Sequence, residues 1–346
     1  MKKTIDKKLF FSMTMDFLNV YIPQDSPSTK TVKTYRDGLT VFRRYVCNEK
    51  RLSISQFRFE DCTFDFVLDY RNWLLDSKKR ARSTVNNRLA SIKSYVSYAA
   101  ARDVTLQQVS LSIAEVPFLR VEKKIRPIIE DTSALKAFLD APPNTRTGCR
   151  DTMILSVLFD TMIRADELIQ INTEDVCLNT ETPYILIHGK GNKERTVALS
   201  DKVVPLVDAY MKEFHDASSR EANLPFIYTV SHDETHRMSE RNVERIVKKY
   251  ADITRQKYPD LPNPVYPHML RRTRGTGLYR DGVPIEAIAV AMGHASIQTT
   301  KDHYAFPSLE QKRASMEKGT GVISSGKEEP EWPDSEDELA RLCGLR

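Results

Sequence analysis

The sequence is poor in cysteine, poor in glycine and free of long apolar runs. Its five cysteines (Cys47, Cys62, Cys149, Cys177 and Cys343) are scattered, odd in number and never form a C-x-x-C pair. This pattern argues against a disulfide framework or a zinc site, and it fits a reducing cytosol. The opening segment MKKTIDKKLF has no sustained apolar core, and no transmembrane run follows it. We therefore expect neither a signal peptide nor a membrane partner.

Charge is only mildly in excess overall, but it is unevenly distributed. The formal net charge is +5 over 346 residues, which permits a polyanionic partner without proving one. Residues 30–58 hold eight Lys or Arg against two acids, and residues 71–103 repeat that ratio. Residues 327–346 instead hold seven acids and three bases. The basic first third of the chain is what contact with phosphates would require.

The N-terminal part of the chain has the periodicity of helices. Residues 30–45 space Val32, Tyr35, Leu39 and Phe42 at helical intervals, and residues 64–75 and 83–101 repeat the pattern. We predict four or five helices with basic outer faces. A plain helical bundle with solvated charges is the alternative, and the periodicity alone favours it.

Two domains with separate cores are expected from the length and from one composition change. The segment VPFLRVEKKIRP carries two prolines and little periodicity, which is typical of a linker. We predict a helical domain over 1–115, a linker over 116–127 and a mixed α/β domain over 128–320. The fold class is mainly α with a small β-hairpin or sheet. The acidic tail, 321–346, is expected to be disordered or to pack on a neighbouring protomer.

One β-hairpin is expected in the second domain. Residues 183–189 (PYILIHG) and 194–200 (ERTVALS) are rich in strand-forming residues, and a Gly-Asn loop over 190–193 joins them. The loop carries two lysines, Lys190 and Lys193. A compact ammonium at a loop tip can contact a phosphate or protonate a leaving oxygen.

The stretch PHMLRRTRGTGLYRDGVPIEAIAVAMGHASIQTTKDHY, residues 267–304, carries a set of residues suited to chemistry on an anion. Pro267 and Pro284 can each begin a helix, and Gly282 and Gly293 can each end one. The helices would present His268, Arg271, Arg272, His294 and Tyr304. Two imidazoles and a guanidinium that converge supply donors for an anion such as a phosphodiester, and a nearby tyrosine hydroxyl is a candidate nucleophile. Separate surface or capping roles are the alternative for any one of them.

Another arginine, Arg164, lies in an R-x-x-E-L sequence that ends with Glu167 and Leu168. A guanidinium can hold two phosphate oxygens and stays charged at any physiological pH. Glu167, one helical turn on, could orient it. A simple intrahelical ion pair is the alternative.

Together these motifs resemble the tyrosine recombinases, the phage integrase family. The resemblance rests on H-x-x-R at 268–271, G-H at 293–294, the tyrosine that follows, R-x-x-E-L at 164–168 and GKGNKER at 189–195. It implies a catalytic set of six residues with Glu167 in support: Arg164, Lys190, His268, Arg271, His294 and Tyr304. Tyr304 would be the nucleophile, His268 the base and Lys190 the general acid, preferred over Lys193. Neither a metal nor a cofactor is implied.

The resemblance also implies domain roles and partners. The domain over 1–115 would bind DNA, and the domain over 128–320 would be catalytic. The substrate would be double-stranded DNA with specific recombination sites, cut and rejoined by a homo-tetramer in a synaptic complex. Accessory DNA-bending or directionality proteins are compatible with this reading. The chain would then be an integrase of a mobile element, located in a bacterial-type cytoplasm with the nucleoid.

Three details depart from the family pattern or leave a choice open. Met162 stands where the family usually has glycine, and Tyr304 lies ten residues after His294 rather than nine. Arg272 competes with Arg271 for the face of His268, and the family pattern favours Arg271. A type IB topoisomerase-like enzyme, a DNA-binding protein with a decayed site and a purely structural helical protein remain as alternatives.

Overall fold

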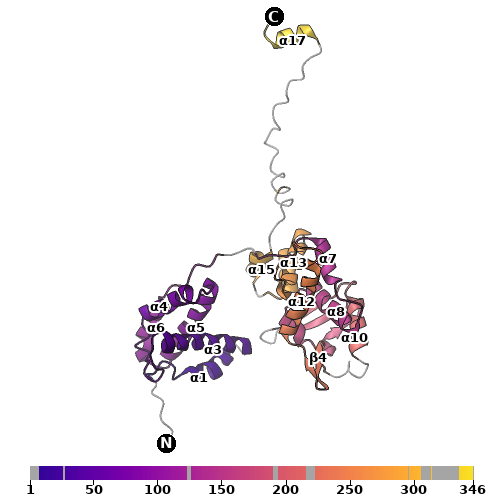
Figure 1. Cartoon of the computed structure of the whole chain (residues 1–346). Helices are drawn as coiled ribbons and strands as arrows, with labels where there is room; N and C mark the ends of the chain where they lie inside the picture. Colours follow the sequence, from indigo (N-terminus) through magenta and orange to yellow (C-terminus); the bar gives the residue numbers. More distant parts are fainter. Residues whose placement is uncertain are drawn as a thin grey trace. The chain divides into compact units, whose positions relative to one another are not determined.

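The structure, a computed structural model, describes residues 8–25, 28–122, 126–189, 194–215, 223–294, 296–304, 313 and 335–345. Within these ranges the chain is mainly helical with two small sheets, which confirms the predicted fold class. It forms two compact units, one ending at Ile125 and one beginning at Arg126. Figure 1 draws the first in indigo to purple and the second in magenta to orange. No helix in the described ranges has the length and apolarity needed to cross a membrane.

In its described residues, the first unit contains helices and one isolated β-bridge, between Leu9 and Arg58. Its two longest helices, α3 and α5, pack side by side. Gly38 permits this, because a Cβ at that position would collide with Ser91 of α5. The elements are α1 (Thr14–Asp16), η1 (Phe17–Tyr21), α2 (Ile22–Asp25), α3 (Thr29–Arg44), η2 (Tyr45–Glu49), α4 (Phe64–Asp76), α5 (Arg82–Ala100), η3 (Val104–Leu106) and α6 (Gln107–Ala114).

Aromatic side chains fill the core of the first unit. Phe10 lies among Phe42, Phe57, Phe59 and Tyr95, with ring centroids 5.0–5.4 Å from its own. Such pairs add to the free energy gained by burying apolar area. A core this rich in rings gives the first unit a fixed scaffold for its charged outer faces.

The second unit carries the helices that hold the candidate site. They are α7 (Thr132–Leu139), α8 (Arg146–Asp160), α9 (Ala165–Gln170), α10 (Val204–Phe214), α12 (Glu240–Arg255), α13 (Pro267–Arg280), α14 (Ile285–Met292) and α15 (Ile297–Tyr304), with a short 3₁₀ turn η4 (Thr173–Asp175). Asp131 caps α7: the backbone N–H of Ser133 donates to Oδ1 of Asp131 over 2.8 Å.

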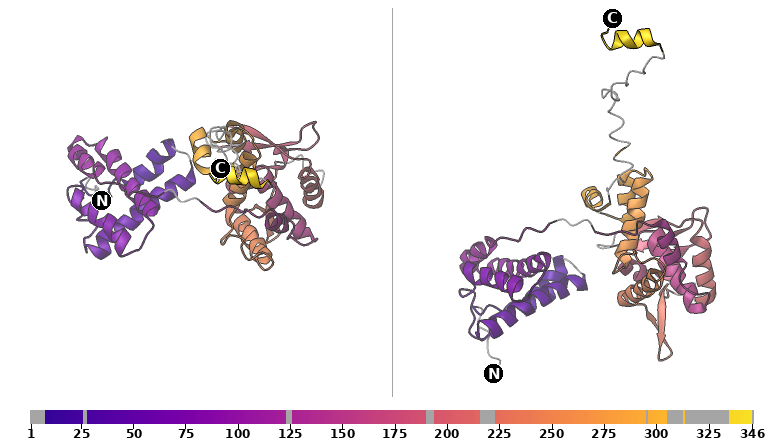
Figure 2. Two further views of the ribbon diagram at one scale, coloured as in Figure 1. Left: turned by 90° about the horizontal axis from the view of Figure 1, so that it is seen from above. Right: turned by 45° about the horizontal axis from the view of Figure 1, so that its top comes forward.

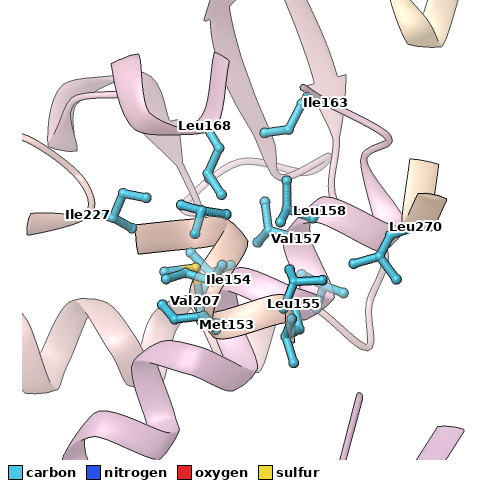
Figure 3. Packing of buried hydrophobic residues seen from close by; sticks show 14 of the residues in the cluster. Met153, Ile154, Leu155, Val157, Leu158, Ile163, Leu168, Val207, Ile227 and Leu270 are labelled. Carbon is cyan, nitrogen blue, oxygen red and sulfur yellow. The ribbon is translucent and has the colours of Figure 1, made fainter. Parts of the chain in front are cut away.

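Helix α8 is the centre of the second core. Apolar side chains on several of its faces are buried, as for a helix surrounded by other elements. Figure 3 shows side chains of α8 in one cluster with Leu168 of α9, Ile227 and Leu270 of α13. This packing fixes α9, which begins directly after Arg164, and α13, which contains Arg271.

Two antiparallel sheets complete the second unit. The first has the order β1-β2-β3, formed by Val176–Cys177, Tyr184–His188 and Glu194–Ala198. Strands β2 and β3 pair from Tyr184 with Ala198 to His188 with Glu194, so the predicted hairpin strands are present. Strands β4 (Tyr228–Ser231) and β5 (Glu234–Arg237) form a second hairpin, which projects from the unit (Figure 2).

The described part of the acidic tail, residues 335–345, contains a helix that the sequence analysis did not anticipate. Helix α17 spans Glu336–Leu342, and its first turn holds three acids, which suits the positive end of the helix dipole. Of residues 305–334, the structure describes only Arg313.

Candidate active site

Helix α13 brings the side chain of Arg271 into the interior of the second unit. The helix begins at Pro267 as expected, and the side chain of Arg271 is fully buried. Its guanidinium donates to the main-chain oxygens of Met162 and, over 2.8 Å, Met292. It also lies 2.9 Å from Nε2 of His294. We call Arg271, Met162, Met292 and His294 the Arg271 network.

The Arg271 network determines the tautomer of His294. A guanidinium can only donate, so Nε2 of His294 must be the acceptor of this contact. The ring proton is then on Nδ1, which lies 2.8 Å from Oγ1 of the buried Thr300 on α15. His294 is thus held on both sides directly after the left-handed end of α14 at Gly293.

Arg164 lies at the start of α9 and is not inside a helix. Its backbone N–H donates to Oε2 of Glu167 over 2.8 Å, and its Nη1 donates to Oε1 of the same carboxylate over 2.8 Å. The side chain of Arg164 is 41% exposed, whereas that of Glu167 is only 8% exposed. A buried carboxylate therefore orients a guanidinium that remains open to a ligand.

The turn that leads to Arg164 keeps a left-handed conformation although it lacks glycine. Met162 has φ +54°, a region that a residue with a side chain adopts at a cost. Its side chain is buried with Ile288 and Met292. The turn thus keeps the backbone conformation that glycine would favour, although Met162 replaces the glycine of the family pattern. The methionine also adds a side chain to the packing against α14.

His268 lies on α13 at the edge of a small pocket of about 200 Å³ that is also lined by Arg164 and Tyr266. Partial burial of the imidazole, together with the charges of Arg271 and Arg272 and of more distant arginines, lowers the pKa of His268 to about 4. The residue as a whole is exposed, so water screens part of this effect. The imidazole is neutral at pH 7, the form that can accept a proton.

Arg272 takes a different position from Arg271. It is also buried, but its Nη2 donates to the hydroxyl of Tyr266 over 2.7 Å, and the described contacts do not connect it to His294. Of the two adjacent arginines, Arg271 is the one that the structure joins to another candidate residue, His294.

Lys190 and Lys193 lie outside the described residues, so their placement is not established. The strands on either side of them are described. At the end of β2, His188 lies 2.8 Å from Oδ1 of the buried Asp175 and 3.1 Å from Oε1 of Glu194 on β3. The hydrogen bond with Asp175 and the two carboxylate charges raise the pKa of His188.

Tyr304 is the last residue of α15, a helix that packs against α13 and α14. The side chain of Tyr304 lies outside the described part of the structure, so its role and its spacing from His294 stay predictions from the sequence.

The structure also places residues that the sequence analysis missed. Arg195 on β3 donates to both oxygens of Glu167, over 3.1 and 2.8 Å. Arg237 on β5 donates to the main-chain oxygens of Ile169 and Ile171 and so caps the C-terminal end of α9. Arg195 stands in the GKGNKER motif, which was the only available signal. Nothing in the sequence pointed to Arg237 or to Thr300.

The first unit has a basic pocket of its own, with a volume of about 440 Å³. Its walls include Arg44, Lys78, Arg80 and Arg88 with one acid, Glu49, which pairs with Lys78 at 3.8 Å. No ion pair of the described residues involves the three arginines. We call Arg44, Arg80 and Arg88 the basic pocket arginines. Among the described residues, no cluster of His, Cys, Asp and Glu has the arrangement of a metal site.

Comparison with known proteins agrees with this geometry. The phage integrase family model matches residues 131–310, more than half of the chain, and the phage integrase SAM-like domain model matches residues 10–112. The chain belongs to the phage integrase family. As a family member, it carries the helical SAM-like domain in its first unit and the integrase domain in its second.

Individual relatives lead to the same family. Tyrosine recombinase XerC of Staphylococcus haemolyticus is 24% identical over 299 residues, covering 86% of this chain and 93% of the relative. Tyrosine recombinase XerD of Staphylococcus epidermidis is 27% identical over 295 residues, covering 83% and 91%.

Solved structures share the fold. The Tn1549 transposon integrase in complex with circular intermediate DNA matches with a TM-score of 0.64 at 15% identity, over 91% of this chain and 100% of that one. The XerH site-specific recombinase bound to palindromic difH substrate matches with a TM-score of 0.62 at 18% identity, over 84% and 80%.

Proposed function

We propose that this integrase-family chain is a site-specific DNA recombinase whose Tyr304 attacks a scissile phosphate. The attack forms a 3′-phosphotyrosyl bond and releases a 5′-hydroxyl. Another DNA strand's 5′-hydroxyl can then displace the tyrosine, so strands are rejoined without an external energy source. Family membership and the relatives described as tyrosine recombinases support this reaction, and the solved relatives bound to DNA support the substrate.

The observation that carries the proposal is the Arg271 network. One buried guanidinium on α13 contacts the turn before Arg164 and the segment from Met292 to His294, so three segments of the chain meet at this arginine. Arg164 and Arg271 would stabilise the charge that develops on the nonbridging oxygens. His294 would join them as a donor once Nε2 carries the proton and Arg271 turns toward the phosphate.

Proton transfer is assigned to two further residues. A tyrosine hydroxyl is a poor nucleophile near pH 7, so a base should assist it. The lowered pKa of His268 keeps its imidazole neutral at pH 7 and able to accept a proton, and it also makes this imidazole a weaker base than that of an unperturbed histidine. Lys190 would protonate the leaving 5′-oxygen. This role rests on the GKGNKER motif alone.

Four protomers would be needed to act on the four strands of two duplexes. Accessory DNA-bending or directionality proteins, a mobile-element origin and association with the nucleoid belong to the same proposal. In the first unit, the basic pocket arginines are the proposed contacts to the DNA backbone, because no carboxylate in the described ion pairs neutralises them.

The test is the capture of the covalent intermediate. The probe is sheared genomic DNA of the organism that encodes the chain, nicked at random so that cleaved ends diffuse away. After denaturation, protein-linked DNA is isolated and sequenced. We expect one recurrent site with the wild-type chain, none with Tyr304→Phe, and wild-type yield with the matched control Tyr279→Phe on α13.

An adduct that survives Tyr304→Phe would identify another nucleophile. Loss of DNA binding in Tyr304→Phe would show a folding defect instead. Binding to the recurrent site found by adduct capture, the selected site, is therefore measured in parallel. If wild-type protein yields no adduct at any site while it still binds DNA, the proposed reaction is wrong and a DNA-binding role remains.

A further inference from the structure

Arg195 connects the β2–β3 hairpin with the start of α9. It is the second residue of β3, and its Nη1 and Nη2 each donate to a different oxygen of Glu167, over 3.1 and 2.8 Å. Its side chain is only 18% exposed. Two parallel bonds between a planar guanidinium and a carboxylate fix direction as well as distance.

The same carboxylate determines the position of Arg164. Each oxygen of Glu167 accepts one bond from Arg195 and one from Arg164, the latter through Nη1 and through the backbone N–H. Burial alone would raise the pKa of Glu167, but these hydrogen bonds and the two positive charges outweigh it and lower that pKa. Glu167 is therefore ionised at pH 7 and shared by two arginines.

A third contact brings Arg195 to the end of α14. Gly293 has φ +65°, and a Cβ built on it would lie 2.8 Å from Cζ of Arg195. The guanidinium thus packs directly against the residue before His294. One side chain contacts both the carboxylate that holds Arg164 and the turn that carries His294.

Arg195 could be a structural ion pair without influence on the reaction. A purely structural pair does not need to share its carboxylate with a half-exposed arginine, and it could tolerate lysine. Without Arg195, Glu167 keeps its charge but loses the partner that fixes its plane, and Arg164 can turn with it. The loss would then fall on the charge stabilisation that Arg164 supplies.

We propose that Arg195 is a positioning residue that orients Arg164 through Glu167 for the stabilisation of charge on the nonbridging phosphate oxygens. This inference rests on the proposed function. The β2–β3 hairpin would then have two roles: strand β3 would hold Arg164 through Arg195, and the loop would supply Lys190 as the general acid. Lysine at position 195 could bind only one oxygen of Glu167 well, so it should not replace the fork of arginine.

The test separates Arg164 from the general acid by means of the leaving group. The probe is the nicked duplex selected by adduct capture, made once with the normal 5′-oxygen and once with a 5′-bridging sulfur at the scissile position. A thiolate leaves without being protonated, because the pKa of a thiol is far below that of an alcohol. Single-turnover adduct rates are measured at saturating DNA for wild type, Arg195→Gln, Arg195→Lys, Arg164→Gln and Lys190→Ala.

We expect Arg195→Gln to lower the adduct rate by about 10- to 100-fold with both substrates, as indirect ligand-orienting contacts do elsewhere. Arg195→Lys should recover only a small part of the rate. Lys190→Ala should form the adduct slowly with the 5′-oxygen substrate, and the 5′-bridging sulfur substrate should restore the rate. The matched control Arg150→Gln removes an arginine of similar exposure that binds Asp151 away from the site, and its rate should equal that of wild type.

Restoration of Arg195→Gln by the sulfur substrate would overturn the proposal, because Arg195 would then act through the general acid. A wild-type rate in Arg195→Gln would overturn it as well. If Arg195→Gln does not fold, as judged by circular dichroism and DNA affinity, Arg195→Lys decides by the same two criteria. Absence of an adduct with the wild-type chain would instead contradict the proposed function itself.

Discussion

Arg271 donates a hydrogen bond to the main-chain oxygen of Met162, a residue 109 positions earlier in the chain. The bond connects helix α13 to a turn in which Met162 has φ +54°. The strained residue and the buried arginine are therefore parts of one arrangement that leads directly to Arg164.

Substitution of Met162 should reveal this strain in the free energy of unfolding. Met162→Gly removes a left-handed cost of about 1–2 kcal/mol but also a buried side chain. Met162→Ala loses the side chain and keeps the strain. We expect the order wild type, then Gly, then Ala, with Gly about 1 kcal/mol more stable than Ala in urea unfolding. An Ala variant as stable as Gly would show that the positive φ carries little strain.

The helices of the candidate site were predictable because their signals are local. Pro267 begins α13, Gly293 ends α14 in the left-handed region, and the strand-forming residues on both sides of 190–193 form the hairpin. Each of these signals acts within a few residues of the structure that it predicts.

The contacts between elements were not predictable in the same way. The Arg195 to Glu167 pair and the His294 to Thr300 contact depend on how β3, α9 and α15 pack, and no spacing rule connects them. Met162 was visible only as a departure from a glycine, and its positive φ required the structure.

His268 should titrate at a pH below its usual range in the protein without DNA. Its pKa is lowered from 6.5 to about 4 by burial and by arginines that include Arg126 and Arg164. The native state then stays neutral where the unfolded chain gains a proton. His268 therefore contributes stability above pH 6.5 that is lost as the pH falls through about 4.

The measurement is an NMR titration of the His268 ring protons, assigned with His268→Gln. Arg126→Gln and Arg164→Gln should each move the midpoint upward, because each removes a positive charge. A midpoint near 6.5 in the wild-type chain would contradict the proposed neutral base at mildly acidic pH.

His188 should stabilise the hairpin most at low pH. The hydrogen bond that His188 donates to Asp175 and the charges of Asp175 and Glu194 raise its pKa, so the native state holds the proton more tightly than the unfolded chain. The stabilisation is complete below the unfolded pKa of 6.5 and is lost as the pH rises through the native value. The melting temperature lost in His188→Gln should be larger at about pH 6 than at about pH 9.

A matched control for His188 is His236→Gln on β5, an exposed histidine 3.7 Å from Glu234. Its effect on the melting temperature should be small and similar at both pH values. An equal loss in His188→Gln at the two pH values would mean that His188 acts as a neutral hydrogen-bonding partner, and the charge would be irrelevant.

The basic pocket arginines should contribute to DNA affinity without reading sequence. Three guanidiniums that lack a carboxylate partner in the described ion pairs can neutralise phosphates, and each such contact releases counterions. Arg44→Gln combined with Arg88→Gln should weaken binding to the selected site and to unrelated DNA by the same factor. The slope of log K against log salt should become less steep by about 2.

The control is Lys50→Gln. The ammonium of Lys50 already pairs with Asp69 at 2.9 Å, so its removal should leave the slope unchanged. If the double variant keeps the wild-type slope, the pocket does not contact the DNA backbone, and the charge excess of the first unit acts elsewhere on its surface.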